Sequence, residues 1–495
     1  MDAILAIDQG TTSTKGITFT TDGELISSSR SPVRQTYPDN GWVEQNPTEL
    51  LNSVLSVLTE EYQKAKTTGI QILSVGITNQ RETTIIWDKH TGQTIYNAIV
   101  WQDRRTADFI QTLKKENLEE QIKAKTGLML DPYFSASKIL WILDNVPNAR
   151  NLSKQGRLLF GTVDTYLIWK LTNGEVHATD VTNASRTSLF NLHTLTWDDD
   201  LLDIYNIPGN VLPSVKKCTD HFGDISRSIV GQSLPIYGVA GDQQAALVGQ
   251  SCFEEGQVKS TYGTGCFALV NTGDKILKSD NNLITTISYQ IQDTLAYGLE
   301  GSIFIAGASS DWLSDNLGII EDYSQIEDMC RSTADDHNVY MVPAFTGLGA
   351  PWWEPNTRAA IYGLTRQTTR NAIVRAAVES VAYQTNDLIA AMARDGVDLS
   401  VMRVDGGMVA NQWFLQFLAN ITRLQIQRPF AMESTSLGAA MLSGLGYGVI
   451  SSLQDISNNW NSSYDADITM HINHRDQLTH RWTQAVKATI AYHSE

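Results

Sequence analysis

The densest polar chemistry of the chain lies almost at its start, in the stretch DQGTTSTKG at residues 8–16. Apolar runs precede it (AILAI) and follow it (ITF), which predicts two buried strands joined by a turn. A hairpin turn needs only a glycine or an asparagine, whereas this one adds an acid, four hydroxyl groups and a lysine. Glycine turns and hydroxyl groups bind phosphate oxygens. The stretch therefore suggests a phosphate-binding hairpin, with Asp8 suited to Mg²⁺ and Lys15 to the charge of a phosphoryl group.

A second turn of similar composition lies in the other half of the chain. The segment VKSTYGTGCFALVNTG at 258–273 predicts strand, glycine-threonine turn and strand, and residues 402–421 predict a strand, a glycine pair and an amphipathic helix. Either turn alone is best interpreted as a plain hairpin bend. Together they favour two similar lobes that clasp a nucleotide in the cleft between them, with the boundary near residues 245–255.

The chain has no GxxxxGK[ST] motif, no protein-kinase catalytic loop and no Rossmann fingerprint after the first strand.

Two further groups of residues suit a small polyol. The predicted strand LPIYGVAGD ends in Asp242, at the strand end where ligands of open α/β sheets bind, although an aspartate there also serves as a helix N-cap. Arg81 and Glu82 form a charged pair between apolar strands, which is typical of a sheet edge or a salt bridge. Trp101 and Tyr133 offer an apolar wall beside these polar groups, as a polyol site requires, although most tryptophans serve packing.

The pattern of the elements is mixed α/β. Asn46, Pro47 and Glu49 suit the N-cap, first and third positions of a helix, and leucines and valines follow at helical spacing. Strands are predicted at residues 3–8, 15–20, 24–29, 72–78, 83–88 and 95–101, and again within 234–242, 258–273 and 402–421.

Composition limits the function. The 495 residues suggest two large domains or about three of average size, and 42% hydrophobic and 18% charged residues are typical of a soluble globular protein. A net charge of −17 argues against nucleic acid as the main partner. No apolar run predicts membrane insertion, the N-terminus lacks the features of a secretory signal, and four widely spaced cysteines predict no disulfide framework. We therefore expect a cytoplasmic protein.

The motifs resemble one known family along essentially the whole chain. DQGTTS, GITNQRETTIIW, YNAIVWQDRRT, DPYFSASKILWILDN, AGDQQAAL, TYGTGCF and STSLGAAMLSGL occur in the order typical of the FGGY carbohydrate kinases. NQRETT, AIVWQDRRT and TYGTGCF resemble the branch that phosphorylates glycerol. The resemblance implies a two-lobed actin-like, ribonuclease H-like ATPase fold, with an N-terminal lobe at 1–250, a C-terminal lobe at 251–495 and a catalytic cleft between them. It also implies glycerol and ATP as ligands, Mg²⁺ as cofactor, and a homo-oligomer, dimer or tetramer.

The same resemblance assigns roles to individual positions. Asp242 would be the catalytic base, Asp8 would hold Mg²⁺, and Lys15 would lie near the transferred phosphoryl group. The glycerol pocket would be formed by Arg81, Glu82, Trp101, Tyr133, Asp242, Gln243 and Phe267. The nucleotide would contact Thr12, Ser13, Thr14, Lys15, Thr264, Gly307, Asp311, Gly407 and Asn411.

The chain departs from the family at several positions. Lys15 stands where arginine is frequent, which keeps the charge but loses the bidentate fork, and Asp311 stands where relatives carry glutamine. The segment DISRSIVGQSLPIYG lacks the basic glycine-rich loop of relatives that fructose 1,6-bisphosphate inhibits. It also has Ser228 where other relatives carry a phosphorylated histidine. We therefore expect neither form of control. Two alternatives stay open: a kinase of this fold for another small polyol or sugar, and an actin-like ATPase that transfers no phosphoryl group.

Overall fold

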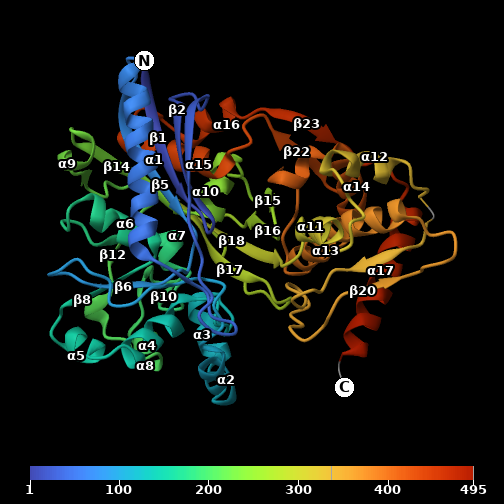
Figure 1. The fold of residues 1–495 in the computed structure, drawn as a ribbon, viewed down its shortest axis with the longest axis horizontal. Coiled ribbons are helices and arrows are strands. Elements are labelled where there is room, and N and C mark those ends of the chain that lie inside the picture. The colour runs from blue at the N-terminus through green and yellow to red at the C-terminus, as the bar shows by residue number, and fades with distance from the viewer. Residues whose placement is uncertain (336, 494–495) are drawn as a thin grey trace.

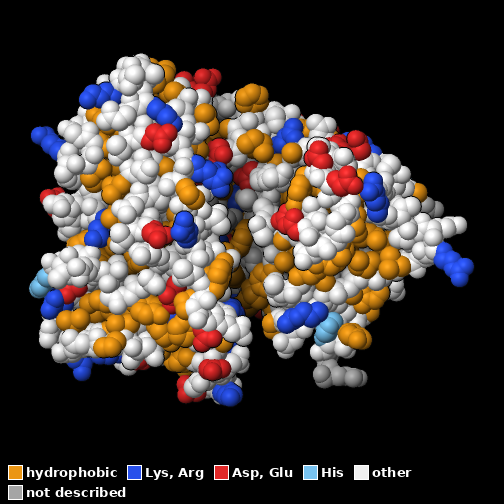
Figure 2. All heavy atoms as spheres, viewed as in Figure 1, with side chains coloured by type: hydrophobic (Ala, Val, Ile, Leu, Met, Phe, Trp, Pro, Cys, Tyr) orange, Lys and Arg blue, Asp and Glu red, His pale blue; other side chains and the backbone are white. Residues whose placement is uncertain are grey.

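The computed structural model describes residues 1–335 and 337–493, and they form two lobes that each contain one large mixed β-sheet. The N-terminal half, blue to green in Figure 1, forms one lobe, and most of the C-terminal half, yellow to red, forms the other. Figure 2 shows a deep groove between them, with basic and acidic side chains beside its upper end. The predicted two-domain α/β architecture is confirmed.

The first sheet has the strand order β13-β14-β5-β1-β2-β3. Strands β1 to β3 form the predicted antiparallel meander, and β5 and β14 run parallel to β1. The helix α1 (Pro47–Thr67) packs with its buried leucines and valines on this sheet, and the Asn46 side chain caps it by accepting a hydrogen bond from the Thr48 N–H. The strands are β1 Asp2–Gln9, β2 Ser13–Thr20, β3 Leu25–Pro32, β5 Gln71–Asn79, β13 Asp224–Ile225 and β14 Leu234–Gly241.

The second sheet has the order β17-β18-β16-β15-β21-β22-β23. It repeats the theme of the first, because β15 and β16 form an antiparallel hairpin and β21 lies parallel beside β15. The predicted pair of strand–turn–strand units is thereby confirmed. The strands are β15 Val258–Tyr262, β16 Cys266–Asn271, β17 Ile284–Ile291, β18 Thr294–Ile303, β21 Val401–Asp405, β22 Gln425–Pro429 and β23 Ser462–Ala466.

Smaller elements complete the N-terminal lobe. The strand expected at 83–88 begins only at Ile85, because the chain bends at Arg81 and Glu82 and Thr84 makes only an isolated bridge to Ile99. The strand expected at 95–101 is reduced to Ala98–Ile99. The elements are β4 Glu44–Gln45, β6 Ile85–Asp88, β7 Ala98–Ile99, α2 Ala107–Lys115, α3 Glu119–Thr126, α4 Ser135–Asn145, α5 Ala149–Lys154, β8 Leu158–Gly161, α6 Val163–Leu171, β9 Ala178–Asp180, α7 Val181–Ala184, β10 Phe190–Asn191, β11 Thr196–Trp197, α8 Asp199–Ile204, η1 Gly209–Val211, β12 Ser214–Lys216 and α9 Arg227–Val230.

The remaining elements of the C-terminal half are helices and one small two-stranded antiparallel sheet, β19–β20. The elements are α11 Ala308–Asp315, η2 Tyr323–Gln325, α12 Ile326–Arg331, β19 Tyr340–Val342, β20 Ala360–Tyr362, α13 Arg370–Arg394, η3 Gly407–Ala410, α14 Gln412–Thr422, α16 Leu453–Asn459 and α17 Ile472–Tyr492. No helix in the described part of the chain has the length and apolarity needed to cross a membrane.

Two helices, α10 (Asp242–Gly249) and α15 (Ser434–Tyr447), cross at the junction of the lobes. Their backbones approach so closely that a Cβ on Gly438 would lie 1.7 Å from the carbonyl oxygen of Ala245. Although α15 belongs to the C-terminal half of the sequence, it packs on the first sheet, where the Ser443 hydroxyl lies 2.8 Å from that of Ser74. The division into 1–250 and 251–495 stays a prediction.

Candidate active site

The first glycine turn joins β1 to β2 and opens at the cleft between the lobes. Its narrow bend is closed by a hydrogen bond from the Gly10 N–H to the Ser13 carbonyl (3.0 Å), and Thr12 is exposed. The Thr14 hydroxyl instead lies 2.6 Å from that of Ser53 on α1 and is fully buried. Any contact between Thr14 and a nucleotide therefore has to use its backbone.

Asp8 and Lys15 are direct cross-strand partners on this hairpin, so their side chains lie on the same face of the sheet. Lys15 Nζ lies 2.6 Å from Glu433 Oε2, and the Ser436 hydroxyl donates to Asp8 Oδ2 (3.3 Å). Burial raises the pKa of Asp8 to about 7; Lys15 opposes the rise, while Asp242 and Glu433 add to it. Carboxylates from both halves of the sequence thus lie together around one lysine.

This arrangement suits Mg²⁺, which takes one or two carboxylates and completes its shell with waters and phosphate. Within residues 1–335 and 337–493, no three acidic, histidine or cysteine side chains converge as metal ligands. The carboxylates that raise the pKa of Asp8 create a negative field that favours a divalent cation. The residues present therefore fit a metal held jointly by the protein and a phosphorylated ligand, with Asp8 as the protein ligand.

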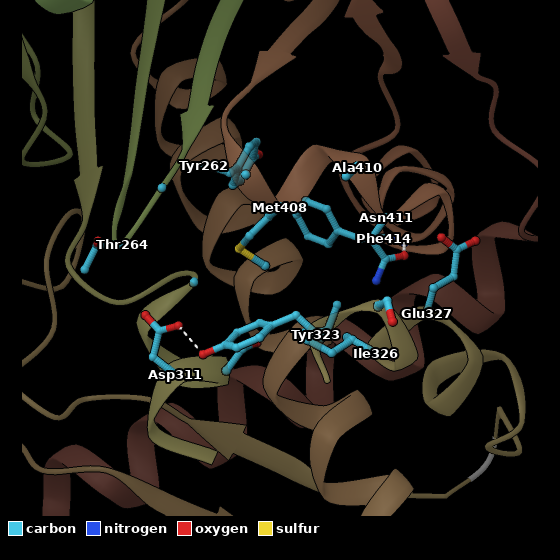
Figure 3. A pocket seen from close by; sticks show the side chains of 16 residues that line it. Tyr262, Thr264, Asp311, Tyr323, Ile326, Glu327, Met408, Ala410, Asn411 and Phe414 are labelled. Atoms are coloured by element: carbon cyan, nitrogen blue, oxygen red, sulfur yellow. Dashed lines mark hydrogen bonds between the residues drawn. The ribbon is translucent and has the colours of Figure 1, made fainter. Parts of the chain in front are cut away.

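The second turn borders a cavity of about 520 Å³ in the C-terminal lobe. This volume lies in the usual range for small-molecule sites. Figure 3 shows strand ends on one side of the cavity and helices on the others. The cavity brings together five residues expected to contact the nucleotide: Thr264, Gly307, Asp311, Gly407 and Asn411. The four expected from the first turn, Thr12, Ser13, Thr14 and Lys15, do not line it.

The walls of this cavity are largely apolar. Phe414 and Met408 lie on one side and Tyr323 and Ile326 on the other, so a flat ring fits between them (Figure 3). Asn411 caps α14 by accepting the Phe414 N–H at 3.0 Å, which leaves its amide nitrogen directed toward the cavity.

Asp311 forms a hydrogen bond across the cavity with another residue that lines it. The Tyr323 hydroxyl donates to Asp311 Oδ1 at 2.8 Å (Figure 3). The backbone N–H of Asp311 also bonds to the Gly307 carbonyl at 3.2 Å, which places this carboxylate one helical turn from the glycine end of the cavity. The departure from the family glutamine therefore adds a negative charge inside the expected nucleotide site.

The residues expected to bind the polyol lie together where β5, α10 and the second sheet meet. Asp242 is the first residue of α10, and its Oδ1 lies 3.2 Å from Arg81 Nε and accepts the Gln243 N–H at 2.7 Å. Lys259 Nζ donates a hydrogen bond to Gln243 Oε1 at 2.5 Å. The amide nitrogen of Gln243 therefore points away from Lys259. The Asp242 side chain is 31% exposed, whereas those of Arg81 and Glu82 are at most 2% exposed.

Aromatic side chains from both lobes wall this region. The Trp101 ring centroid lies 5.6 Å from that of Tyr133 and 6.2 Å from that of Phe267, which comes from β16 in the other lobe. The Trp101 indole N–H donates to the Thr11 hydroxyl at 3.1 Å, so the wall is tied to the first glycine turn. The buried Lys138 donates to three successive backbone carbonyls, including that of Tyr133, and thereby fixes the loop that carries this tyrosine.

Behind Arg81 and Glu82 lies a buried network of charges. Glu300 on β18 accepts hydrogen bonds from Arg81 (2.5 and 3.1 Å) and from Arg186 (2.9 Å), and Arg186 Nε donates to Glu82 Oε1 at 2.6 Å. Burial alone raises the pKa of Glu300, but Arg186 and Arg81 bring it down to about 2. Burial raises the pKa of Glu82 despite the same two arginines. The charged pair at 81–82 is thus part of a salt-bridge network, one of the interpretations left open by the sequence.

Sequence reasoning missed four charged residues of the site: Lys259, Arg186, Glu300 and Glu433. Two of them carried a usable signal. Lys259 and Glu300 interrupt the apolar strand sequences VKSTY and LAYGLEGSI, where a charged residue is expected only if it is paired. Arg186 and Glu433 lie in polar segments and carried no such signal.

The chain is similar to known proteins along most of its length. The models of the N-terminal and C-terminal domains of the FGGY family of carbohydrate kinases match residues 3–249 and 258–447. Glycerol kinase 1 of Clostridium tetani is 51% identical over 98% of both chains. Glycerol kinase of Alteromonas mediterranea is also 51% identical over 98% of both.

Solved structures extend the likeness to the fold. The crystal structure of Plasmodium falciparum glycerol kinase with ADP matches with a TM-score of 0.94 and 39% identity, covering 99% of this chain and 98% of that one. Gluconate kinase from Lactobacillus acidophilus, at 22% identity and a TM-score of 0.89, shares the fold over 99% of both chains. The chain therefore belongs to the FGGY family of carbohydrate kinases.

Proposed function

We propose that the protein transfers the γ-phosphoryl group of ATP to glycerol and forms sn-glycerol 3-phosphate, the entry step of glycerol breakdown. The observation that carries this proposal is the position of Asp242, which lies beside Arg81 at the junction of the two lobes. The names of the relatives at about half identity support glycerol as the substrate. Trp101 and Phe267 meet edge to face, with ring centroids 6.2 Å apart, and offer an apolar surface that suits a short carbon chain.

In this proposal Asp242 is the general base. Both of its contacts with the protein fall on Oδ1, so Oδ2 is the atom that receives the proton of the terminal glycerol hydroxyl. Arg81, Glu82 and Gln243 hold hydroxyl groups, while Trp101, Tyr133 and Phe267 cover the carbon chain. Because phosphoryl transfer proceeds through a loose transition state, the main task of these residues is positioning.

The nucleotide occupies the cavity and extends toward the first turn. Its base lies between the apolar walls, and Thr264, Gly307, Asp311, Gly407 and Asn411 line its path. Thr12, Ser13, Thr14 and Lys15 face its terminal phosphates. Mg²⁺ bound through Asp8 would neutralise charge on the β- and γ-phosphates. Lys15 leaves Glu433 to contact the transferred group, and approach of the lobes excludes water.

Two further properties belong to the proposal. We expect a homo-oligomer, as the family resemblance implies, and analytical ultracentrifugation tests it. We also expect a cytoplasmic location, which fits four cysteines that are all free and buried.

A coupled assay of ADP release tests the function and its alternatives. Glycerol, dihydroxyacetone, a ketopentose and gluconate are compared, each with and without fructose 1,6-bisphosphate. We expect kcat/KM to be highest for glycerol and the bisphosphate to have no effect. A higher value for another polyol or sugar would show a different kinase of this fold. ADP release that glycerol does not stimulate would show an ATPase that transfers no phosphoryl group.

A further inference from the structure

The buried charge network reaches the polyol site from the opposite lobe. Glu300 lies in β18, where it is the register partner of Leu269 in β16 and of Ile284 in β17. Arg81 and Arg186 belong to the N-terminal half. One carboxylate of the second sheet therefore bridges the guanidinium groups of Arg81, which belongs to the polyol site, and of Arg186 behind it.

The network is closed to solvent and balanced in charge. The side chains of Arg81, Glu82, Arg186 and Glu300 are each at most 2% exposed, and they contribute two positive and two negative charges. Burying charges is costly, and removing one member leaves an uncompensated charge in the interior. These four groups are buried although apolar residues would fill the same space at lower cost, and two of them, Arg81 and Glu82, are residues expected to bind substrate.

The network restricts how Arg81 and Glu82 can point. Arg81 uses Nη1 and Nη2 on Glu300 and lies with Nε beside Asp242, so its guanidinium plane is fixed from two sides. Glu82 has the unusual positive φ of 59°, and its Oε1 is taken by Arg186. Glu82 Oε2 is therefore the oxygen that remains to accept a hydrogen bond from a substrate hydroxyl group.

The hairpin that carries Glu300 is docked firmly on the N-terminal lobe. The Tyr297 hydroxyl donates to the Leu192 carbonyl at 2.9 Å, and the Thr285 N–H donates to the Gly127 carbonyl at 3.1 Å. The position of Glu300 relative to the two arginines therefore depends on this interface.

We infer that Glu300 and Arg186 are positioning residues of the polyol site: Glu300 orients Arg81 directly and orients Glu82 through Arg186, so that the site is complete only with the β17–β18 hairpin docked. This inference rests on the proposed glycerol site. Neither residue needs to touch glycerol. Their loss weakens glycerol binding because the hydroxyl-binding groups lose their orientation, and small misplacements of such groups are costly.

The test compares Glu300→Gln with Glu300→Asp, which keeps the charge on a shorter side chain. We expect Glu300→Gln to raise the KM and Kd for glycerol about 10- to 100-fold, with a smaller change in kcat and little change in the Kd for ADP. Glu300→Asp should recover part of the glycerol affinity. A glycerol Kd within about twofold of the wild type in folded Glu300→Gln would overturn the inference.

Glu379→Gln is the matched control. Glu379 is also buried in the C-terminal lobe and accepts a hydrogen bond from Arg375 Nε at 2.7 Å. It does not belong to the buried charge network behind the polyol site. We expect it to lower stability and leave the glycerol KM unchanged. An equal rise in glycerol KM in both variants would assign the effect to general loosening and overturn the inference.

Two measurements separate this inference from the proposed function. If Glu82→Gln binds glycerol as the wild type does while the wild type phosphorylates glycerol, the assigned pocket fails and the inference fails with it. If Glu300→Gln binds glycerol as the wild type does but Glu82→Gln does not, the inference fails while the proposed function stands. Should both Glu300 variants fail to fold, hydrogen exchange on the wild type decides: glycerol should slow amide exchange in residues 284–303, and unchanged exchange there overturns the inference.

Discussion

Lys15 Nζ lies 2.6 Å from Glu433 Oε2, and this ion pair joins the first glycine turn to the start of α15. The lysine that is expected to meet the γ-phosphate is therefore engaged by a carboxylate in the structure. Both side chains are about one-third exposed, so the pair is weak and a phosphate can displace the carboxylate.

Removing the Glu433 carboxylate, which competes with phosphate for Lys15, should favour nucleotide binding. We expect Glu433→Gln to lower the KM for ATP by about two- to fivefold, since exposed pairs contribute about 1 kcal/mol or less. Lys15→Ala should lower kcat about 10²- to 10³-fold, the usual effect of losing one donor to a transition-state charge, while Lys15→Arg should keep most activity. Steady-state kinetics over ATP concentration give both results. A higher ATP KM in Glu433→Gln would show that Glu433 assists binding instead, for example on the metal side.

Asp242 is the next residue to test. Asp242→Asn keeps the shape of the side chain and its contacts on Oδ1 but removes the proton acceptor, so kcat should fall by about 10²- to 10⁴-fold. Glycerol and ADP affinities, measured calorimetrically, should change much less. Nearly intact turnover with both sites occupied would exclude Asp242 as the base.

The sequence predicted the strand–turn–strand units well because their signals are local. Apolar runs on both sides of glycine turns predicted β1–β2 and β15–β16, and Asn46 with Pro47 predicted the start of α1. The 95–101 strand was overestimated, since β7 holds only Ala98 and Ile99. Its apolar residues pack in the interior without extending a ladder.

The long-range electrostatics could not be predicted in the same way. The contact of Lys15 with Glu433 spans 418 positions, and that of Arg81 with Glu300 spans 219. No local pattern specifies such pairs, because they depend on how α15 and β18 meet the first lobe. The family resemblance assigned the residues expected to touch ligands, while the residues behind them became visible only in the structure.

Asp311 offers a test of the departure from the family pattern. Its carboxylate lies in the nucleotide cavity and accepts the Tyr323 hydroxyl. We expect Asp311→Gln to lower the KM for ATP by about two- to fivefold, because it removes a negative charge near an anionic ligand. The effect should shrink at high salt, where screening is strong. Tyr323→Phe is the control that keeps the charge and removes the hydrogen bond. A raised ATP KM in Asp311→Gln would show that the carboxylate itself binds the nucleotide.

The helix crossing at Gly438 predicts a steric limit. A Cβ there would lie 1.7 Å from the carbonyl oxygen of Ala245, so Gly438→Ala must push α15 away from α10. We expect a loss of about 1–3 kcal/mol in the free energy of unfolding, or more, measured by urea denaturation. Gly209→Ala is the matched control, because its Cβ would meet only the Leu202 side chain at 3.4 Å. Equal stability of the two variants would contradict this crossing.

Asp164 predicts a pH dependence of stability. It lies buried in α6, accepts hydrogen bonds from the hydroxyls of Thr162 (2.5 Å) and Thr179 (2.7 Å), and has Asp180 nearby. Burial, with a contribution from Asp180, raises its pKa from 3.8 to about 7. Between these values the folded chain keeps a proton that the unfolded chain has lost. The contribution of this residue to the free energy of unfolding therefore falls as pH rises from about 4 to 7, by at most about 1.4 kcal/mol per pH unit.

Asp164→Asn should remove this contribution, because the amide does not titrate. We expect the variant to lose less stability than the wild type between pH 5 and 7, and urea denaturation at about pH 5.5, 6.5 and 8 measures the difference. Asp293→Asn, at a fully exposed site, controls for the loss of one negative charge and should follow the wild-type slope. If Asp164→Asn also follows that slope, Asp164 does not hold a proton in the folded state. The hydroxyls of Thr162 and Thr179 would then stabilise the ionised carboxylate and outweigh its burial.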